Sequence, residues 1–180
     1  MENKAISEDL LLNEDKTVDI SQTNHKIYHW YERDESLLKA EKTAMHKAFP
    51  NFTLDKLDDG RLAWIGSLNV GILGDNEWHI MAVYNHNHPH PVMGGTVRVY
   101  LITPDIDELI CECQWATSKL LKDSNGQFYL CTFDVDNLKI GNVTTSAAAH
   151  IAMAVKWFMA FELVLIGELT KEEFSADGII

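Results

Sequence analysis

Cys131 is a candidate for nucleophilic chemistry in this chain. A cysteine thiolate is a strong nucleophile that can accept an acyl group and pass it to an amine. Asp134 and Asp136 follow closely, and either carboxylate could orient an incoming amine if the backbone turns after Phe133. The alternative is that Cys131 is a small core residue on a strand, because cysteines outside disulfides are among the most buried residue types.

Asparagine side chains near Cys131 are candidates to donate hydrogen bonds to a developing oxyanion. They are Asn125, Asn137 and Asn142. Asn125 precedes Gly126, and this pair is the strongest hairpin signal in the sequence, because a type I′ turn needs positive φ at both central residues. The turn predicts that residues 127–133 pair with residues 115–122, which places Cys131 on a hairpin strand.

A histidine-rich segment lies between two predicted strands. His86, His88 and His90 alternate, so in an extended segment their rings would share one side. That arrangement is a partial metal site, but zinc requires four ligands at defined spacing and nothing completes the pattern. We therefore expect no metal and no cofactor, with a metal-binding His loop as an alternative. If the loop flanks the active site, His88 and His90, together with Asp136, are candidate substrate-binding residues.

The composition predicts one globular domain that does not bind nucleic acid. The chain has 180 residues and is 46% hydrophobic, which suffices for one substantial core. A formal net charge of -12 disfavours a nucleic-acid groove, because phosphate binding needs clustered Lys and Arg. Cys111, Cys113 and Cys131 are an odd number of cysteines, so a complete disulfide framework is not implied.

The N-terminal region predicts a tail rather than a targeting signal. Residues 1–25 contain six acidic residues and no aromatic residue, so we expect a flexible acidic tail over residues 1–27 and a domain over residues 28–180. The start lacks the basic and apolar regions of a secretory signal, which favours a cytoplasmic location. The apolar stretch 147–169 carries His150, Lys156 and Glu162, so we expect a buried core helix and not a membrane span.

Hydrophobic periodicity predicts an α+β domain. A first helix is expected at Ser36–Phe49, begun by a cap at Asp34 or Ser36 and stopped by Pro50. The expected strands are 52–57 and 61–70 around the turn Asp58-Asp59-Gly60, then 77–84 and 96–103, with a weaker candidate at 110–115 that would place Cys111 and Cys113 on one buried face. The predicted architecture is an N-terminal helix, an antiparallel β-meander of about four strands, an active-site segment, and a long buried C-terminal helix from about Thr144.

This order of elements resembles the ubiquitin-conjugating enzyme family over about Ser36 to Leu169. The phrases that carry the resemblance are Leu62-Ala63-Trp64-Ile65-Gly66 on a strand after the first helix, the bend Tyr84-Asn85-His86-Asn87-His88-Pro89-His90-Pro91, the strand Val97-Arg98-Val99-Tyr100-Leu101, and Asn125-Gly126-Gln127-Phe128-Tyr129-Leu130-Cys131. The last phrase is similar to the family's Asn-Gly turn and catalytic cysteine, with two extra residues between them. The family's His-Pro-Asn motif is missing, and Lys119-Leu120-Leu121-Lys122 stands near its place.

The resemblance implies a transferase that carries a ubiquitin-like protein, or another protein's C-terminus, as a thioester on Cys131. It implies catalytic roles for Asp134 and Asn125, an activating enzyme and a modified target protein as partners, and no membrane or nucleic acid. The divergence is typical of bacterial relatives in modification or antiviral defence systems. A catalytically inactive binding module on the same fold is the alternative function.

Overall fold

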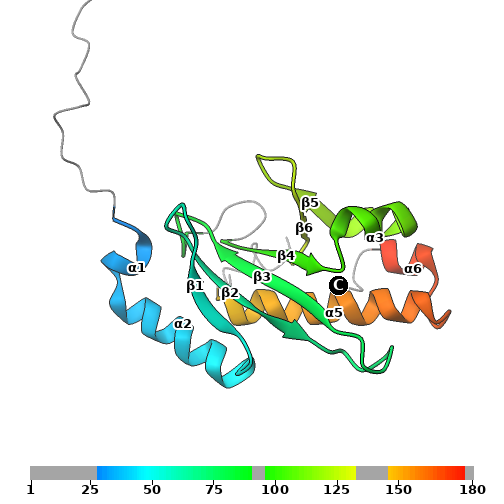
Figure 1. Cartoon of the computed structure of the whole chain (residues 1–180), viewed down its shortest axis with the longest axis horizontal. Helices are drawn as coiled ribbons and strands as arrows, with labels where there is room; N and C mark the ends of the chain where they lie inside the picture. The colour runs from blue at the N-terminus through cyan, green and yellow to red at the C-terminus, as the bar shows by residue number, and fades with distance from the viewer. Residues whose placement is uncertain (1–27, 91–95, 133–145, 177–180) are drawn as a thin grey trace, which may run out of the picture.

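A computed structural model describes residues 28–90, 96–132 and 146–176 as a mixed α+β fold built on one sheet. The sheet has six strands in the order β1-β2-β3-β4-β6-β5, and each neighbouring pair is antiparallel (Figure 1). The predicted α+β class is therefore confirmed. The expected tail over residues 1–27 lies outside the described residues.

Two helices precede the sheet. A short helix α1, Trp30–Arg33, leads into α2, Glu35–Ala48, close to the predicted bounds. Asp34 caps α2, because its carboxylate accepts a hydrogen bond from the Leu37 backbone N–H at 2.9 Å. Pro50 stands just beyond the end of α2, where a proline cannot continue a helix.

The next four strands form the predicted meander. They are β1 Thr53–Lys56, β2 Leu62–Leu68, β3 Trp78–Tyr84 and β4 Val97–Thr103. Gly60 has a φ of 82° in the turn between β1 and β2, a conformation that favours glycine. Alternate residues of β3 and β4 are buried against the helices, as the period of two predicts.

A second hairpin extends the sheet from about four strands to six. It consists of β5 Leu120–Lys122 and β6 Phe128–Leu130, and β6 lies between β4 and β5. The Asp123 N–H donates to Gln127 O at 2.9 Å and the Gly126 N–H donates to Asp123 O at 3.1 Å. These bonds enclose a three-residue loop with Gly126 at φ 82°, so the hairpin is confirmed but the expected two-residue turn is wrong.

The weaker strand expected at 110–115 is wrong. The chain instead forms helix α3, Ile106–Glu112, and a 3-10 helix η2, Gln114–Lys119. Asp105 is the N-cap of α3, because its carboxylate accepts a hydrogen bond from the Asp107 N–H at 2.8 Å. Such a cap pairs a backbone N–H of the first helical turn that would otherwise have no partner. Cys111 is consequently exposed and Cys113 half-buried, so the two thiols do not share a buried strand face.

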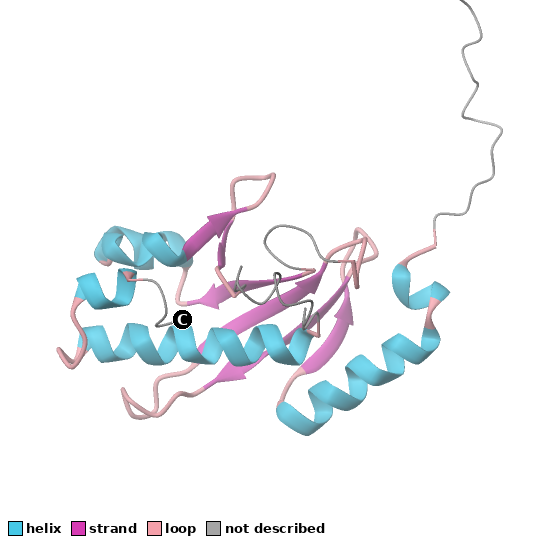
Figure 2. Cartoon of the chain, turned by 180° about the vertical axis from the view of Figure 1, so that it is seen from behind, coloured by secondary structure: helices cyan, strands magenta, loops and turns pink. Residues whose placement is uncertain are grey.

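Helix α5, Ala147–Leu165, covers one face of the sheet, and the short helix α6, Lys171–Ser175, follows it (Figure 2). Trp157 and Phe158 are fully buried, and the Trp78 ring on β3 stacks on Phe158 at 4.6 Å between centroids. On length and composition alone α5 could cross a membrane, with a mean hydropathy of 1.5. In the fold it is the predicted core helix, because its apolar side packs against the sheet.

Candidate functional site

Cys131 directly follows β6. Its backbone N–H donates to the Lys119 carbonyl at 3.1 Å, which continues the β5–β6 register for one residue beyond the strand. The residue is partly exposed and carries a thiol that is not in a disulfide. Cys131 therefore lies just beyond the C-terminal end of β6 and is partly accessible to solvent.

The residues on either side of Cys131 establish which face its side chain occupies. Leu130 is 1% exposed and pairs with Val99, which is fully buried beneath α5. Thr132 is buried, and its Oγ1 lies 2.9 Å from Nδ1 of His150 on α5. Because successive side chains alternate, Cys131 faces the side of the sheet opposite α5. This orientation argues against the alternative that Cys131 is a buried core residue on a strand.

Arg98 is a cationic residue of β4 next to Val99, the register partner of Leu130. One step beyond the Val99–Leu130 pair brings Arg98 opposite Cys131, where Cβ atoms of facing residues lie about 5 Å apart. The Arg98 guanidinium carbon lies 5.1 Å from the Tyr129 ring centroid, which holds it over β6. Its Nε is buried and has no acceptor within the part of the chain that the structure describes.

A depression of about 670 Å³ opens beside Arg98. It is lined by the segments 85–87 and 123–125, together with Arg98, Asp59 and Arg61. Arg61 Nε pairs with Asp59 Oδ2 at 2.6 Å. Burial alone would raise the pKa of Asp123, but hydrogen bonds from the Gln127 and Asn125 backbone and from Tyr100 outweigh it and hold the pKa below its usual value. The lining is therefore polar with balanced charges.

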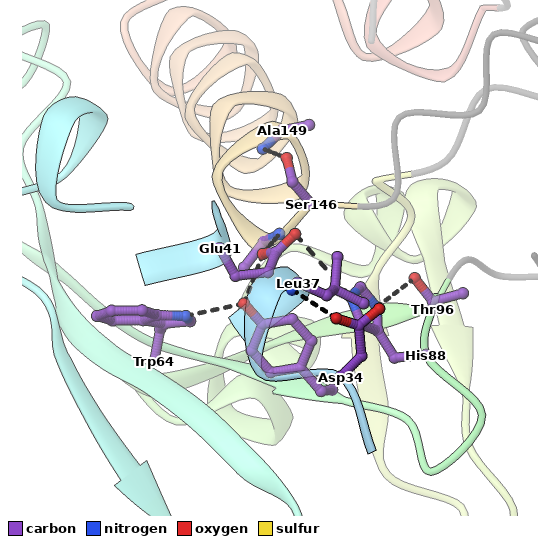
Figure 3. A network of polar contacts seen from close by, with 10 residues as sticks. Asp34, Leu37, Glu41, Trp64, His88, Thr96, Ser146 and Ala149 are labelled. Atoms are coloured by element: carbon purple, nitrogen blue, oxygen red, sulfur yellow. Dashed lines mark hydrogen bonds and ion pairs between the residues drawn. The ribbon is translucent and has the colours of Figure 1, made fainter. Parts of the chain in front are cut away.

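On the face of the sheet that α5 covers, buried polar groups lie between α2 and α5. We call the set the buried polar cluster, and it comprises Glu41, Tyr84, His88, Thr96, Thr132 and His150. The Oε2 atom of Glu41 accepts from the Tyr84 hydroxyl at 2.6 Å and from the Ala147 backbone N–H at 2.9 Å (Figure 3). Glu41 of α2 thus binds the first residue of α5 directly, where the helix leaves backbone donors unpaired.

The two histidines of the cluster are held neutral. Burial lowers the pKa of both His88 and His150 to about 4. His88 Nδ1 lies 3.0 Å from Thr96 Oγ1, whereas its Nε2 is 3.9 Å from Glu41 Oε1 and has no hydrogen-bond partner within the described chain. Burial also raises the pKa of Glu41, although hydrogen bonds from Tyr84 and Ala147 oppose that rise.

The buried polar cluster binds the chain on both sides of residues 133–145. Thr132, which precedes that segment, contacts His150, and the backbone N–H of Ala147, which follows it, donates to Glu41. Thr132 also immediately follows Cys131. The contact between Thr132 and His150 consequently helps to orient Cys131 toward the opposite face of the sheet.

The structure does not bring Asn125 and Cys131 together. Asn125 lies in the turn before β6 and Cys131 follows the other end, so about 13 Å of extended chain separates Gln127 from Cys131. Asp134 and Asp136 lie outside the described residues. The same holds for the two other asparagine candidates, Asn137 and Asn142.

The histidine loop differs from its extended prediction. The His88 N–H donates to Asn85 O at 3.1 Å and the His90 N–H donates to Asn87 O at 2.9 Å, so the segment forms consecutive turns. His88 is buried whereas His86 and His90 are exposed, and the three rings do not share one side. Within residues 28–90, 96–132 and 146–176, no group of three or more His, Cys, Asp or Glu side chains could hold a metal ion.

Sequence reasoning missed Arg98, Glu41 and His150. The sequence carries a signal for each of them, because each is a polar residue within an otherwise apolar stretch of a predicted strand or helix. Arg98 interrupts the strand Val97–Leu101, and Glu41 lies four residues before Met45 on the apolar stripe of α2. A charged residue on such a stripe indicates a satisfied buried partner.

Comparison of the chain with protein-family models, curated proteins and solved structures found no match.

Proposed function

We propose that this protein is an acyl carrier of the ubiquitin-conjugating type. It accepts the C-terminus of a ubiquitin-like protein as a thioester on Cys131 and transfers it to an amine of a target protein. The donor would be the thioester of an activating enzyme. The succession of α2, a four-strand meander and a C-terminal helix resembles that family. The observation that carries the proposal is that Cys131 is partly exposed and faces the side of the sheet opposite α5.

The chemistry needs two acyl transfers. In the first, the Cys131 thiolate attacks the carbonyl carbon of the donor thioester, a new C–S bond forms, and the donor thiolate leaves. In the second, a neutral amine attacks the same carbon, a C–N bond forms, and the C–S bond to Cys131 breaks. The amine proton passes to a base or to solvent. Neither step requires a metal ion or a redox partner.

A chemically prepared thioester tests the first transfer without an activating enzyme. The protein is incubated with a peptide whose C-terminal glycine is esterified to mercaptoethanesulfonate, and the adduct is measured by intact mass before and after reductant. We expect one peptide per chain, located on Cys131, sensitive to reductant, and transferred to added lysine.

Two variants make the result specific. Both proteins carry Cys111→Ala, which removes the exposed thiol of α3 that would itself exchange with a small thioester. Cys131→Ala in this background should abolish the adduct. An adduct that forms equally with and without Cys131, or no adduct at all, would show that Cys131 is no acyl carrier. The non-catalytic binding module would then be the better description.

A further inference from the structure

We propose that the N-terminal segment 6–20 of this chain binds along the outer side of α5, the side that faces away from the sheet. This surface and Cys131 lie on different sides of the sheet, so the inference does not depend on the proposed function. It assigns a partner, which is a segment of the same chain, to an exposed apolar surface of the described fold.

The outer side of α5 carries a continuous row of exposed side chains. Residues 152, 156, 159, 163 and 166 recur at intervals of three and four, so their side chains share one side of the helix. We call this set the α5 outer stripe, and it consists of Ala152, Lys156, Met159, Leu163 and Ile166. Met159 is 42% exposed and Ile166, at the C-terminal end of α5, is 47% exposed.

Four of the five members of the α5 outer stripe are apolar, and Lys156 is the one that is charged. The solvent side of a surface helix is normally polar, whereas a helix that is apolar all round is normally covered on every side. α5 has a mean hydropathy of 1.5 and is apolar on both its sheet side and its outer side. Because apolar area left in water costs about 25 cal/mol per Å², a partner that covers the stripe is favoured.

The segment 6–20, which lies outside the described residues, has a composition complementary to the α5 outer stripe. It carries five acidic residues and one lysine. Its apolar residues are Ile6, Leu10, Leu11, Leu12, Val18 and Ile20. The leucines can cover Met159 and Leu163, while the carboxylates are attracted to Lys156. Apolar contact supplies the affinity, and the charge favours this segment over a basic one.

The segment is also tethered close to α5. The Trp30 ring of α1 lies 4.6 Å from the His88 ring, His88 Nε2 lies 3.9 Å from Glu41 Oε1, and Glu41 accepts from the N–H of Ala147, the first residue of α5, at 2.9 Å. The connection 21–27 spans at most about 28 Å. A 19-residue helix is itself about 28 Å long. The segment 6–20 can therefore reach the outer stripe.

Two other occupants fit the α5 outer stripe less well. A helix side about 28 Å long and about 10 Å wide offers on the order of 300 Å² per partner, whereas stable complexes bury about 800 Å² per partner. A second copy would therefore bind weakly. A tethered segment needs less area, because its linker supplies an effective concentration in the millimolar range. The net charge of -12 disfavours an anionic lipid surface.

The reactivity of Met159 with a small oxidant tests the contact in the full chain. Dilute protein is treated with hydrogen peroxide, and the rate constants of sulfoxide formation at Met159 and Met81 are measured by peptide mass spectrometry. Met81, half-buried on β3, is the internal reference. In the triple variant Leu10→Ser, Leu11→Ser, Leu12→Ser we expect Met159 to react about fivefold faster than in the unmodified protein, as for a Kd of about 0.2 mM against an effective concentration of about 1 mM.

A charge reversal provides a second, independent variant. Lys156→Glu places a like charge against the acidic segment and should also speed oxidation of Met159, whereas Lys42→Glu, at an exposed position of α2, should not. In the background of the triple leucine variant, Lys156→Glu should have no further effect, because the contact is already lost.

Three results would overturn the proposal. The first is an equal rate at Met159 in the unmodified protein and in a triple variant that circular dichroism shows to be folded. The second is protection of Met159 that increases with protein concentration, which would assign the α5 outer stripe to a second copy. The third is protection that appears only when phosphatidylcholine vesicles are added, which would assign the stripe to a lipid surface.

Discussion

At the residue scale, the same side-chain type has different roles because its surroundings differ. Cys131 is placed at a strand end on the face opposite α5, whereas burial raises the pKa of the Cys113 thiol and so disfavours its thiolate. The histidines divide in the same way. His90 is exposed in a turn, while His88 and His150 are buried as neutral rings. These two buried rings determine how the protein should respond to acid.

The stability of the fold should fall between pH 6.5 and pH 4. The unfolded chain binds protons on both His88 and His150 near pH 6.5, whereas the folded protein does so only near pH 4, so the unfolded state gains protons first. Each histidine contributes at most about 3 kcal/mol over this interval. Glu41 acts in the opposite direction, because its raised pKa favours the folded state as pH falls. Urea unfolding at pH 7, 6 and 5 measures the net loss.

Two variants separate the contribution of the His150 ring to the pH dependence of stability. In His150→Leu the change in the free energy of unfolding between pH 7 and pH 5 should be smaller by the contribution of one histidine. The variant also removes the partner of Thr132 and so lowers stability at pH 7. His90→Ala changes an exposed ring and should leave the pH dependence unaltered. An equal slope in the unmodified protein and His150→Leu would contradict the assignment of a buried neutral ring.

At the element scale, α5 is connected to the sheet by a buried carboxylate as well as by apolar packing. Glu162 is fully buried and accepts hydrogen bonds from the Leu73 backbone N–H at 2.9 Å, from Asn76 Nδ2 at 2.9 Å and from Trp78 Nε1 at 2.7 Å. These donors belong to the segment between β2 and β3 and to the start of β3. One side chain therefore fixes that connection against the helix.

Glu162→Gln should lower the free energy of unfolding by about 2 to 3 kcal/mol, because hydrogen bonds to a charged acceptor are strong and the new amide places donors against donors. Glu168→Gln is a matched control, since Glu168 is exposed beyond the end of α5 and should change stability by less than about 0.5 kcal/mol. Urea unfolding followed by tryptophan fluorescence compares the three proteins. Equal midpoints for all of them would show that the Glu162 contacts contribute little.

Element by element, the sequence predicted most of the scaffold. Periodicity and caps located α2, the four strands of the meander, the second hairpin and α5 within a few residues. The prediction failed at 110–115, where alternating residues suggested a strand but the Asp105 cap starts a helix. It also failed for the His loop, where consecutive turns replace an extended chain. In both places short-range hydrogen bonds outweigh a weak hydrophobic pattern.

At the scale of the whole molecule, α5 is the central core helix of the described fold. Transfer of α5 to a bilayer would strip Glu162 of three hydrogen bonds and remove Trp157 and Phe158 from the core. We expect the full chain, expressed without detergent, to stay in the supernatant after ultracentrifugation and not to float with lipid vesicles. Recovery only in the membrane pellet, released by detergent alone, would contradict this expectation.

The sequence by itself determined the fold class and the order of most elements, because hydrophobic periodicity, helix caps and turn residues act over a few neighbouring positions. It named Cys131 as a candidate nucleophile only through the resemblance of its flanking residues to a known family. Only the tertiary structure decided the surroundings of that thiol. Pairing between β4 and β6 sets Val99 opposite Leu130, the residue before Cys131, and Glu41 binds Ala147 although 106 positions separate them. Such contacts depend on register and packing between distant segments, which no local pattern specifies.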